Sequence, residues 1–226
     1  MIVARPFRRL GLRRSTSGSA AVEFAFIMPF LLVLLLGAFE VSRYITTLRK
    51  VTLASNSVAE ILSQNQSGTI TVIDVLTAFD SIMITFPGVL ADAHAKGIDW
   101  YNDIQATFSS VAFTPTKPGC TSNCIYTANV AWTWPWNSTG RVCGVPQTSV
   151  SDTSPPTLTA LPQSSFGPGS MIVVDVAYVY TPTVATKLFS PMTIRKSFYI
   201  PPRRVPLVKL DPAAEGVLGL RRCPGY

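Results

Sequence analysis

The most strongly apolar part of the chain lies near its beginning. Residues 20–39 read AAVEFAFIMPFLLVLLLGAF, and Glu23 is the only charged residue in this run. An α-helix rises about 1.5 Å per residue, so about twenty residues extend about 30 Å, the thickness of the hydrocarbon core of a bilayer. The run therefore predicts a helix that crosses a membrane once.

Beyond this run the helix is predicted to continue as an amphipathic stalk. Apolar and small residues recur at spacings of three and four with charged residues between them, which is the pattern of a helix with one buried face. The predicted buried stripe consists of Val41, Ile45, Leu48, Thr52, Ser55, Val58, Ile61 and Leu62. Residues 65–68 supply turn chemistry that ends a helix. We therefore expect one helix over residues 20–63, within a transmembrane and stalk region at 19–64.

The remaining residues, 65–226, are predicted to form an α+β head. A second helix is indicated by apolar residues on one face, with Pro87 and Gly88 as its end: Val72, Val75, Leu76, Phe79, Ile82 and Met83. Runs rich in aromatic and β-branched residues predict strands at 103–113, 124–134, 171–180 and 193–200. This order favours an antiparallel sheet with helices on one face. Residues 146–170, rich in Pro, Ser, Thr and Gly, are predicted to be a long surface loop.

Basic residues are concentrated before the apolar run. Five of the 19 Lys and Arg residues precede it and account for most of the net charge of +7: Arg5, Arg8, Arg9, Arg13 and Arg14. Basic residues beside a membrane span favour the cytoplasmic side, so we expect a cytoplasmic N-terminus, although Arg43, Arg49 and Lys50 oppose this bias. The charge is thus a signal of topology, and we expect no binding of nucleic acid.

Two kinds of processing fit a basic leader followed by an apolar run. A secretory signal peptide has an apolar stretch of about 7–15 residues that ends in small residues of the A-x-A type. Here the run is longer and continues into residues 40–44, EVSRY, without such a site. The second kind involves Gly18, Ser19 and Glu23. A carboxylate near hydrocarbon costs about 3 kcal/mol, so Glu23 is a functional candidate unless its side chain simply extends to the lipid headgroups.

The order of Gly18, Ser19 and Glu23 resembles the processing site of type IV prepilins. The segment Ala20-Ala21-Val22-Glu23-Phe24-Ala25, and more weakly residues 175–203, resemble TadE-like proteins, the pseudopilins of tight-adherence (Flp) pilus systems. This resemblance implies that a prepilin peptidase cleaves after Gly18 and removes the leader, residues 1–18. It also implies that Glu23 pairs with the free N-terminal amine, on Ser19, of a neighbouring subunit.

The same resemblance implies a role in assembly. We expect a minor pseudopilin of a Flp/Tad pilus that takes part in pilus assembly and surface adherence, with one span in the bacterial inner membrane and its head in the periplasm. The implied partners are the prepilin peptidase, other pilus and pseudopilin subunits, and inner-membrane lipid. The alternative hypothesis is a membrane-anchored periplasmic binding protein or enzyme unrelated to pili.

Catalytic chemistry is not indicated by the sequence. It contains no HExxH motif and no glycine-rich phosphate loop, and its one histidine, His94, is expected on the surface. We therefore predict neither enzymatic activity nor a cofactor. Trp132, Trp134 and Trp136 alternate along one predicted strand, so they share a face, where a ladder in the core is favoured over an exposed patch.

All of the cysteines follow the apolar run, at Cys120, Cys124, Cys143 and Cys223. If this part of the chain faces an oxidising periplasm, one or two disulfides are expected, and three complete pairings are possible. A structural zinc site is the alternative, which the lack of a CxxC pair disfavours.

Overall fold

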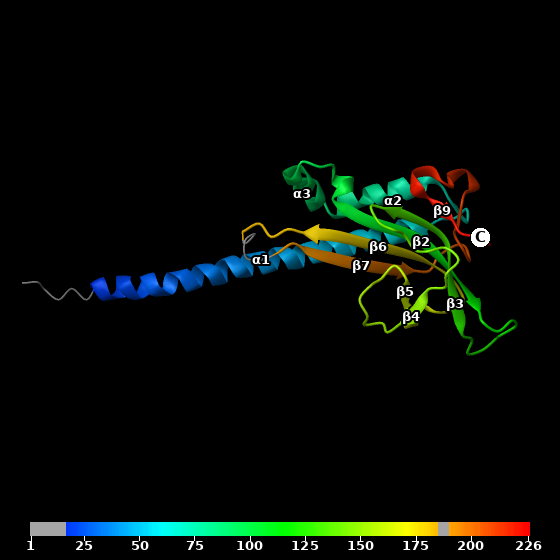
Figure 1. Cartoon of the computed structure of the whole chain (residues 1–226), viewed down its shortest axis with the longest axis horizontal. Helices are drawn as coiled ribbons and strands as arrows, with labels where there is room; N and C mark the ends of the chain where they lie inside the picture. Colours follow the sequence, from blue (N-terminus) through cyan, green and yellow to red (C-terminus); the bar gives the residue numbers. More distant parts are fainter. Residues whose placement is uncertain (1–16, 185–189) are drawn as a thin grey trace, which may run out of the picture.

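A long helix and a head make up the computed structural model, which describes residues 17–184 and 190–226. Helix α1 (Ser17–Ser63) extends far beyond the head at its N-terminal end (Figure 1). The helix predicted over residues 20–63 is therefore confirmed, and it begins three residues earlier. The five arginines of the leader lie outside the described residues.

Only the second half of α1 packs on the head. Its buried face consists of Val51, Ala54, Ser55, Val58, Ala59 and Leu62, each no more than 1% exposed. The predicted stripe was correct at Ser55, Val58 and Leu62, but Val41, Ile45 and Thr52 are exposed. The observed face instead includes Val51, Ala54 and Ala59, and the head leaves the helix uncovered at Val41 and Ile45.

The second predicted helix is confirmed as α2 (Val72–Thr85). It begins with a capping box: the Thr71 hydroxyl accepts a hydrogen bond from the amide of Asp74, and the Asp74 carboxylate accepts one from the amide of Thr71 at 2.8 Å. Pro87 and Gly88 end this helix as expected. A third helix that was not predicted, α3 (Gly88–Lys96), starts there and is bent by 90° from α2.

An antiparallel sheet forms the centre of the head. Its spatial order is β7 (Met192–Ile200), β6 (Gly169–Tyr180), β2 (Ile104–Pro115), β3 (Tyr126–Trp136) and the short β9 (Arg221–Arg222). Each of the four predicted strands is present, with ends that differ by no more than two residues. Helices α1 and α2 share one core with this sheet (Figure 1), so the predicted α+β class is confirmed.

Aromatic side chains fill the core between the helices and the sheet. Phe79 of α2 lies 5.0 Å from Trp100, 5.3 Å from Trp134 and 5.5 Å from Trp136, measured between ring centroids. Trp132 and Trp134 are fully buried, and their indole N–H groups donate to backbone carbonyls of the C-terminal segment. The predicted tryptophan ladder in the core is confirmed.

One end of the second face of the sheet is covered by the segment that was predicted as a long surface loop. Residues 146–170 contain a parallel pair of short strands, β4 (Thr148–Val150) and β5 (Ala160–Pro162). Leu161 is buried, and Phe166 packs against Phe113 of β2 with ring centroids 5.5 Å apart. The segment is therefore a packed layer over one end of this face.

Short elements complete the described part of the chain. Strands β1 (Thr69–Ile70) and β8 (Lys209–Leu210) form a parallel pair that brings the C-terminal segment beside the end of α1. Single 3-10 turns occur at η1 (Trp100–Asn102), η2 (Gln163–Ser165), η3 (Pro212–Ala214) and η4 (Val217–Gly219).

The central position of Phe79 gives a prediction about stability. Replacing Phe79 with Ala should lower the free energy of unfolding by about 3–5 kcal/mol, because it leaves a cavity among the tryptophans. The matched control on the same helix is Ile84→Ala, since Ile84 is 83% exposed; it should change stability by less than about 0.5 kcal/mol. Urea unfolding of the full chain in detergent, followed by tryptophan fluorescence, measures both. Equal losses in the two variants would contradict this account of the core.

Candidate functional site

The residues of the predicted processing site lie at the free end of α1. Gly18 is the second residue of the helix, Ser19 follows it, and Glu23 lies about one turn further along. Gly18 and Glu23 are exposed, and a Cβ added at Gly18 would meet no atom within 4 Å. The structure thus places the three predicted residues together at the end of α1 far from the head (Figure 1).

The apolar run between this end and the head is uncovered. Its large side chains project from a single helix, with Phe30 74% exposed and Leu34 69% exposed. Helix α1 is long and apolar enough to cross a membrane, and none of its most apolar window is buried inside the protein. A surface of this kind needs lipid or other apolar helices around it.

A buried carboxylate, which the sequence analysis missed, marks the point where α1 meets the head. Glu40 directly follows the apolar run and is only 6% exposed. Its carboxylate accepts hydrogen bonds from the Tyr180 hydroxyl and from the amides of Thr183 and Val184, each amide at 3.3 Å. Burial, together with the bond to Glu40, raises the pKa of Tyr180 to about 12.

Two neighbours of Glu40 strengthen this junction. The Arg43 guanidinium donates to the hydroxyl of Thr183. Tyr44 packs edge-on against Tyr180 with ring centroids 5.5 Å apart. Residues 140 positions apart in sequence are thereby joined, so the end of β6 is held against α1 where the helix leaves the head.

Beside the junction, α3 carries a small network of charges. The Lys96 ammonium lies 2.7 Å from the Asp92 carboxylate and 2.6 Å from the Asp103 carboxylate. The Tyr178 hydroxyl also donates to Asp92. Burial raises the pKa of the Asp103 carboxyl. This network connects α3 to the start of β2 and to β6.

On the second face of the sheet, Arg141 is a fully buried cation. Its guanidinium forms a two-point ion pair with Asp175 of β6, in which both N–O distances are 2.9 Å. It also donates to the Gln147 side chain at 2.7 Å and to the carbonyls of Thr157 and Ala160. These bonds hold residues 146–170 against the sheet and satisfy the donors of the buried guanidinium.

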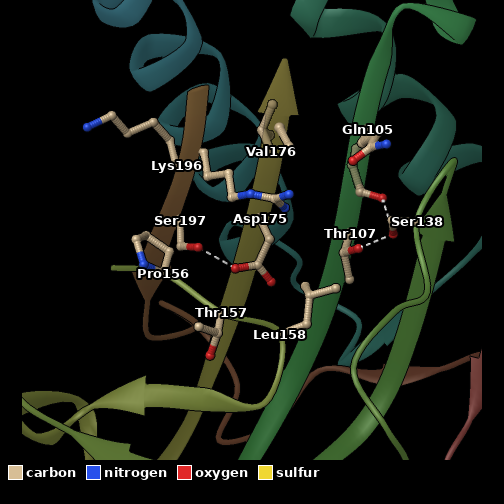
Figure 2. Close-up of a pocket in the computed structure, with 13 residues that line it drawn as sticks. Gln105, Thr107, Ser138, Pro156, Thr157, Leu158, Asp175, Val176, Lys196 and Ser197 are labelled. Atoms are coloured by element: carbon tan, nitrogen blue, oxygen red, sulfur yellow. Dashed lines mark hydrogen bonds between the residues drawn. The ribbon is translucent and has the colours of Figure 1, made fainter. Parts of the chain in front are cut away.

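A small cavity adjoins this ion pair. Figure 2 shows Asp175 accepting a hydrogen bond from Ser197 on the neighbouring strand, and Thr107 paired with Ser138 on the opposite side. The cavity has a volume of about 70 Å³, whereas sites for small molecules usually measure about 300–1,000 Å³. The geometry therefore assigns this polar cluster to the packing of the head.

The cysteines are brought together in one of the three possible pairings. Cys120 and Cys124 have Cα atoms 5.8 Å apart, and Cys143 and Cys223 have Cα atoms 5.1 Å apart; each pair is joined by a disulfide. Within the described residues, no group of three or more His, Cys, Asp or Glu side chains is placed to hold a metal ion. His94 is exposed on α3, as predicted.

Comparison with protein-family models gives a match at the N-terminal end of the described chain. Residues 18–60 match the family described as TadE-like protein. The N-terminal segment is TadE-like. This TadE-like segment begins at Gly18 and includes Glu23, the uncovered apolar run, Glu40 and most of the face that packs on the head. It confirms the resemblance inferred from the sequence over these residues. Comparisons with curated proteins and with solved structures find no significant match.

The two disulfides are predicted to differ in their contribution to stability. The Cys143–Cys223 bond joins residues 80 positions apart and the Cys120–Cys124 bond joins residues 4 apart. Because a longer loop restrains the unfolded chain more, the Cys143→Ser variant should lose about 4–5 kcal/mol and the Cys120→Ser variant about 2 kcal/mol. Denaturant unfolding of protein from an oxidising compartment measures both losses. Four cysteines that alkylate without prior reduction would contradict the pairing.

Proposed function

We propose that the chain is a minor pseudopilin that takes part in assembly of a Flp/Tad-type pilus and in surface adherence. The observation that carries this proposal is the TadE-like match over residues 18–60, on a helix whose apolar half is uncovered. The proposed role is structural: α1 remains in a membrane or joins a filament, while the head contacts other pilus subunits. It needs no catalytic group and no cofactor.

Processing is proposed to occur after Gly18. The site lies at the exposed end of α1, where no other described element covers it. Removal of residues 1–18 by a prepilin peptidase creates a free amine on Ser19. Glu23 then lies about one helical turn from this end, so its carboxylate can pair with the amine of a neighbouring subunit. Such pairing offsets the cost of placing either charge in an apolar environment.

The proposed topology places the N-terminus in the cytoplasm and the head in the periplasm, with one span in the inner membrane. The basic residues that precede Gly18 support this orientation. The two disulfides of the head support it as well, because disulfides persist in oxidising compartments. Inner-membrane lipid is accordingly a proposed partner of residues 20–39.

The processing step has a direct test. The mature N-terminus is determined by mass spectrometry on protein from isogenic cells with and without their prepilin peptidase. We expect the chain to start at Ser19 only when the peptidase is present, and at residue 1 otherwise. The variant Gly37→Ala is a suitable control, because a Cβ at Gly37 meets no atom within 4 Å and the residue lies far from the cleavage site. A start beyond Phe39 would overturn the proposal.

The role of Glu23 in assembly is tested separately. Glu23→Ala should leave cleavage intact but reduce the number of assembled pili at least about tenfold, because a buried charged pair then loses one partner. Glu60→Gln is the matched control: it removes an acid from the same helix, where Glu60 pairs with Arg203 at the surface, and it should assemble normally. Pili are counted by electron microscopy. Normal pili with the Glu23 variant would favour the alternative that α1 is only an anchor.

A further inference from the structure

A second, larger cavity lies where the head meets the apolar run of α1. It has a volume of about 390 Å³ and is bounded by α1, α3 and the end of β6. This is within the usual range for a site that binds a small molecule or headgroup. The residues that α1 contributes to its wall are Ser42, Arg43, Thr46, Thr47 and Lys50.

These residues lie at the level of lipid headgroups if the apolar run spans a bilayer. Phe39 is the last residue of the run, and Arg43 follows it by four residues, or about 6 Å along the helix. The headgroup layer is about 5–8 Å thick on each side of the hydrocarbon core. Lys50 lies about 16 Å beyond Phe39 by the same rise, and its long side chain can extend back toward the membrane.

The cavity offers donors that are suited to a phosphate group. Arg43 uses part of its guanidinium on Thr183, which leaves further N–H groups for a ligand. In the described part of the chain, Lys50 forms no ion pair and the hydroxyls of Ser42 and Thr47 donate no hydrogen bond. Arg43, Thr47 and Lys50 are spaced four and three residues apart, so they share a face of the helix.

The carboxylates near the cavity are already engaged. Asp92 lines the cavity but pairs with Lys96 at 2.7 Å and accepts a bond from Tyr178. Glu40 is buried and accepts bonds from Tyr180 and from two backbone amides. Among the described residues Lys50 therefore has no acidic partner, whereas the charge of Arg43 is partly balanced by the nearby carboxylate of Glu40.

We propose that this cavity binds the phosphate of a membrane phospholipid, with Arg43, Thr47 and Lys50 as the donors. A lipid is the favoured source of the phosphate because the cavity opens beside the helix at the point where the uncovered apolar run ends. The lipid then holds the head close to the membrane surface. This inference rests on the proposed insertion of α1 in a membrane, but not on a role in pilus assembly.

The test is lipid binding by the purified full chain in detergent. Short-chain phosphatidylglycerol is titrated in, and bound lipid is counted by native mass spectrometry. The variants Lys50→Gln and Thr47→Val should each weaken binding, with a loss of at least about tenfold for Lys50→Gln, the effect of losing one charged hydrogen bond. Arg49→Gln is the matched control. It removes the same charge from the adjacent position, and Arg49 does not line the cavity. It should change affinity by less than about twofold.

Three outcomes would overturn the proposal. Equal weakening by Arg49→Gln would indicate general attraction between basic residues and anionic lipid. Equal binding of diacylglycerol, which has the acyl chains without the phosphate, would show that the phosphate does not contribute to binding. Displacement of the lipid by the same concentration of inorganic phosphate would identify a soluble anion as the ligand.

Membrane insertion itself is tested by association of the wild-type chain with vesicles, measured by flotation. This measurement separates a failure of the lipid site from a failure of the proposed topology.

Discussion

The uncovered apolar half of α1 is the constraint on which the rest of the structure depends. Thirteen large apolar side chains between Val22 and Phe39 are at least 44% exposed. Burial of one such side chain contributes about 1.5–3 kcal/mol, so their combined exposure to water would cost more than the whole stability of an ordinary domain. The head supplies no cover for them. The helix therefore has to lie in lipid or among other helices, which fixes one end of the head beside an apolar phase.

The junction at Glu40 is a consequence of this constraint. Helix α1 continues without a break from the apolar run to the face that packs on the head, so the two halves cannot change direction independently. Glu40 accepts a hydrogen bond from Tyr180, the last residue of β6, and both Glu40 and Arg43 bond to Thr183 just beyond it. Hydrogen bonds to a charged group contribute about 1.5–3 kcal/mol each when they are buried. The head is thereby fixed to the helix next to the expected membrane surface, instead of swinging on a linker.

Local pattern was sufficient to predict the elements that are long and periodic. The apolar run of α1, the amphipathic face of α2 and the alternating residues of the main strands each carry a strong signal within a dozen residues. What the sequence concealed depends on contacts between distant residues: Glu40 with Tyr180, Arg141 with Asp175, and Trp132 with the carbonyl of Val208. Short elements such as β4 and β9 have too few residues to show a periodic pattern of apolar and polar positions. Helix α3 did have a local signal, since Pro87 precedes it and Gly97 ends it with φ of 69°.

The two faces of the sheet depend on different partners. The first face is packed against α1 and α2, so its residues determine how the head is held on the TadE-like segment. The second face is completed inside the head by Arg141, which ties residues 146–170 to Asp175. It follows that substitutions on the second face change the stability of the head but not its direction relative to the membrane. Substitutions among the buried residues of α1, such as Ala54 and Ala59, change both, because these residues belong to the core and also lie on the face by which the helix is attached.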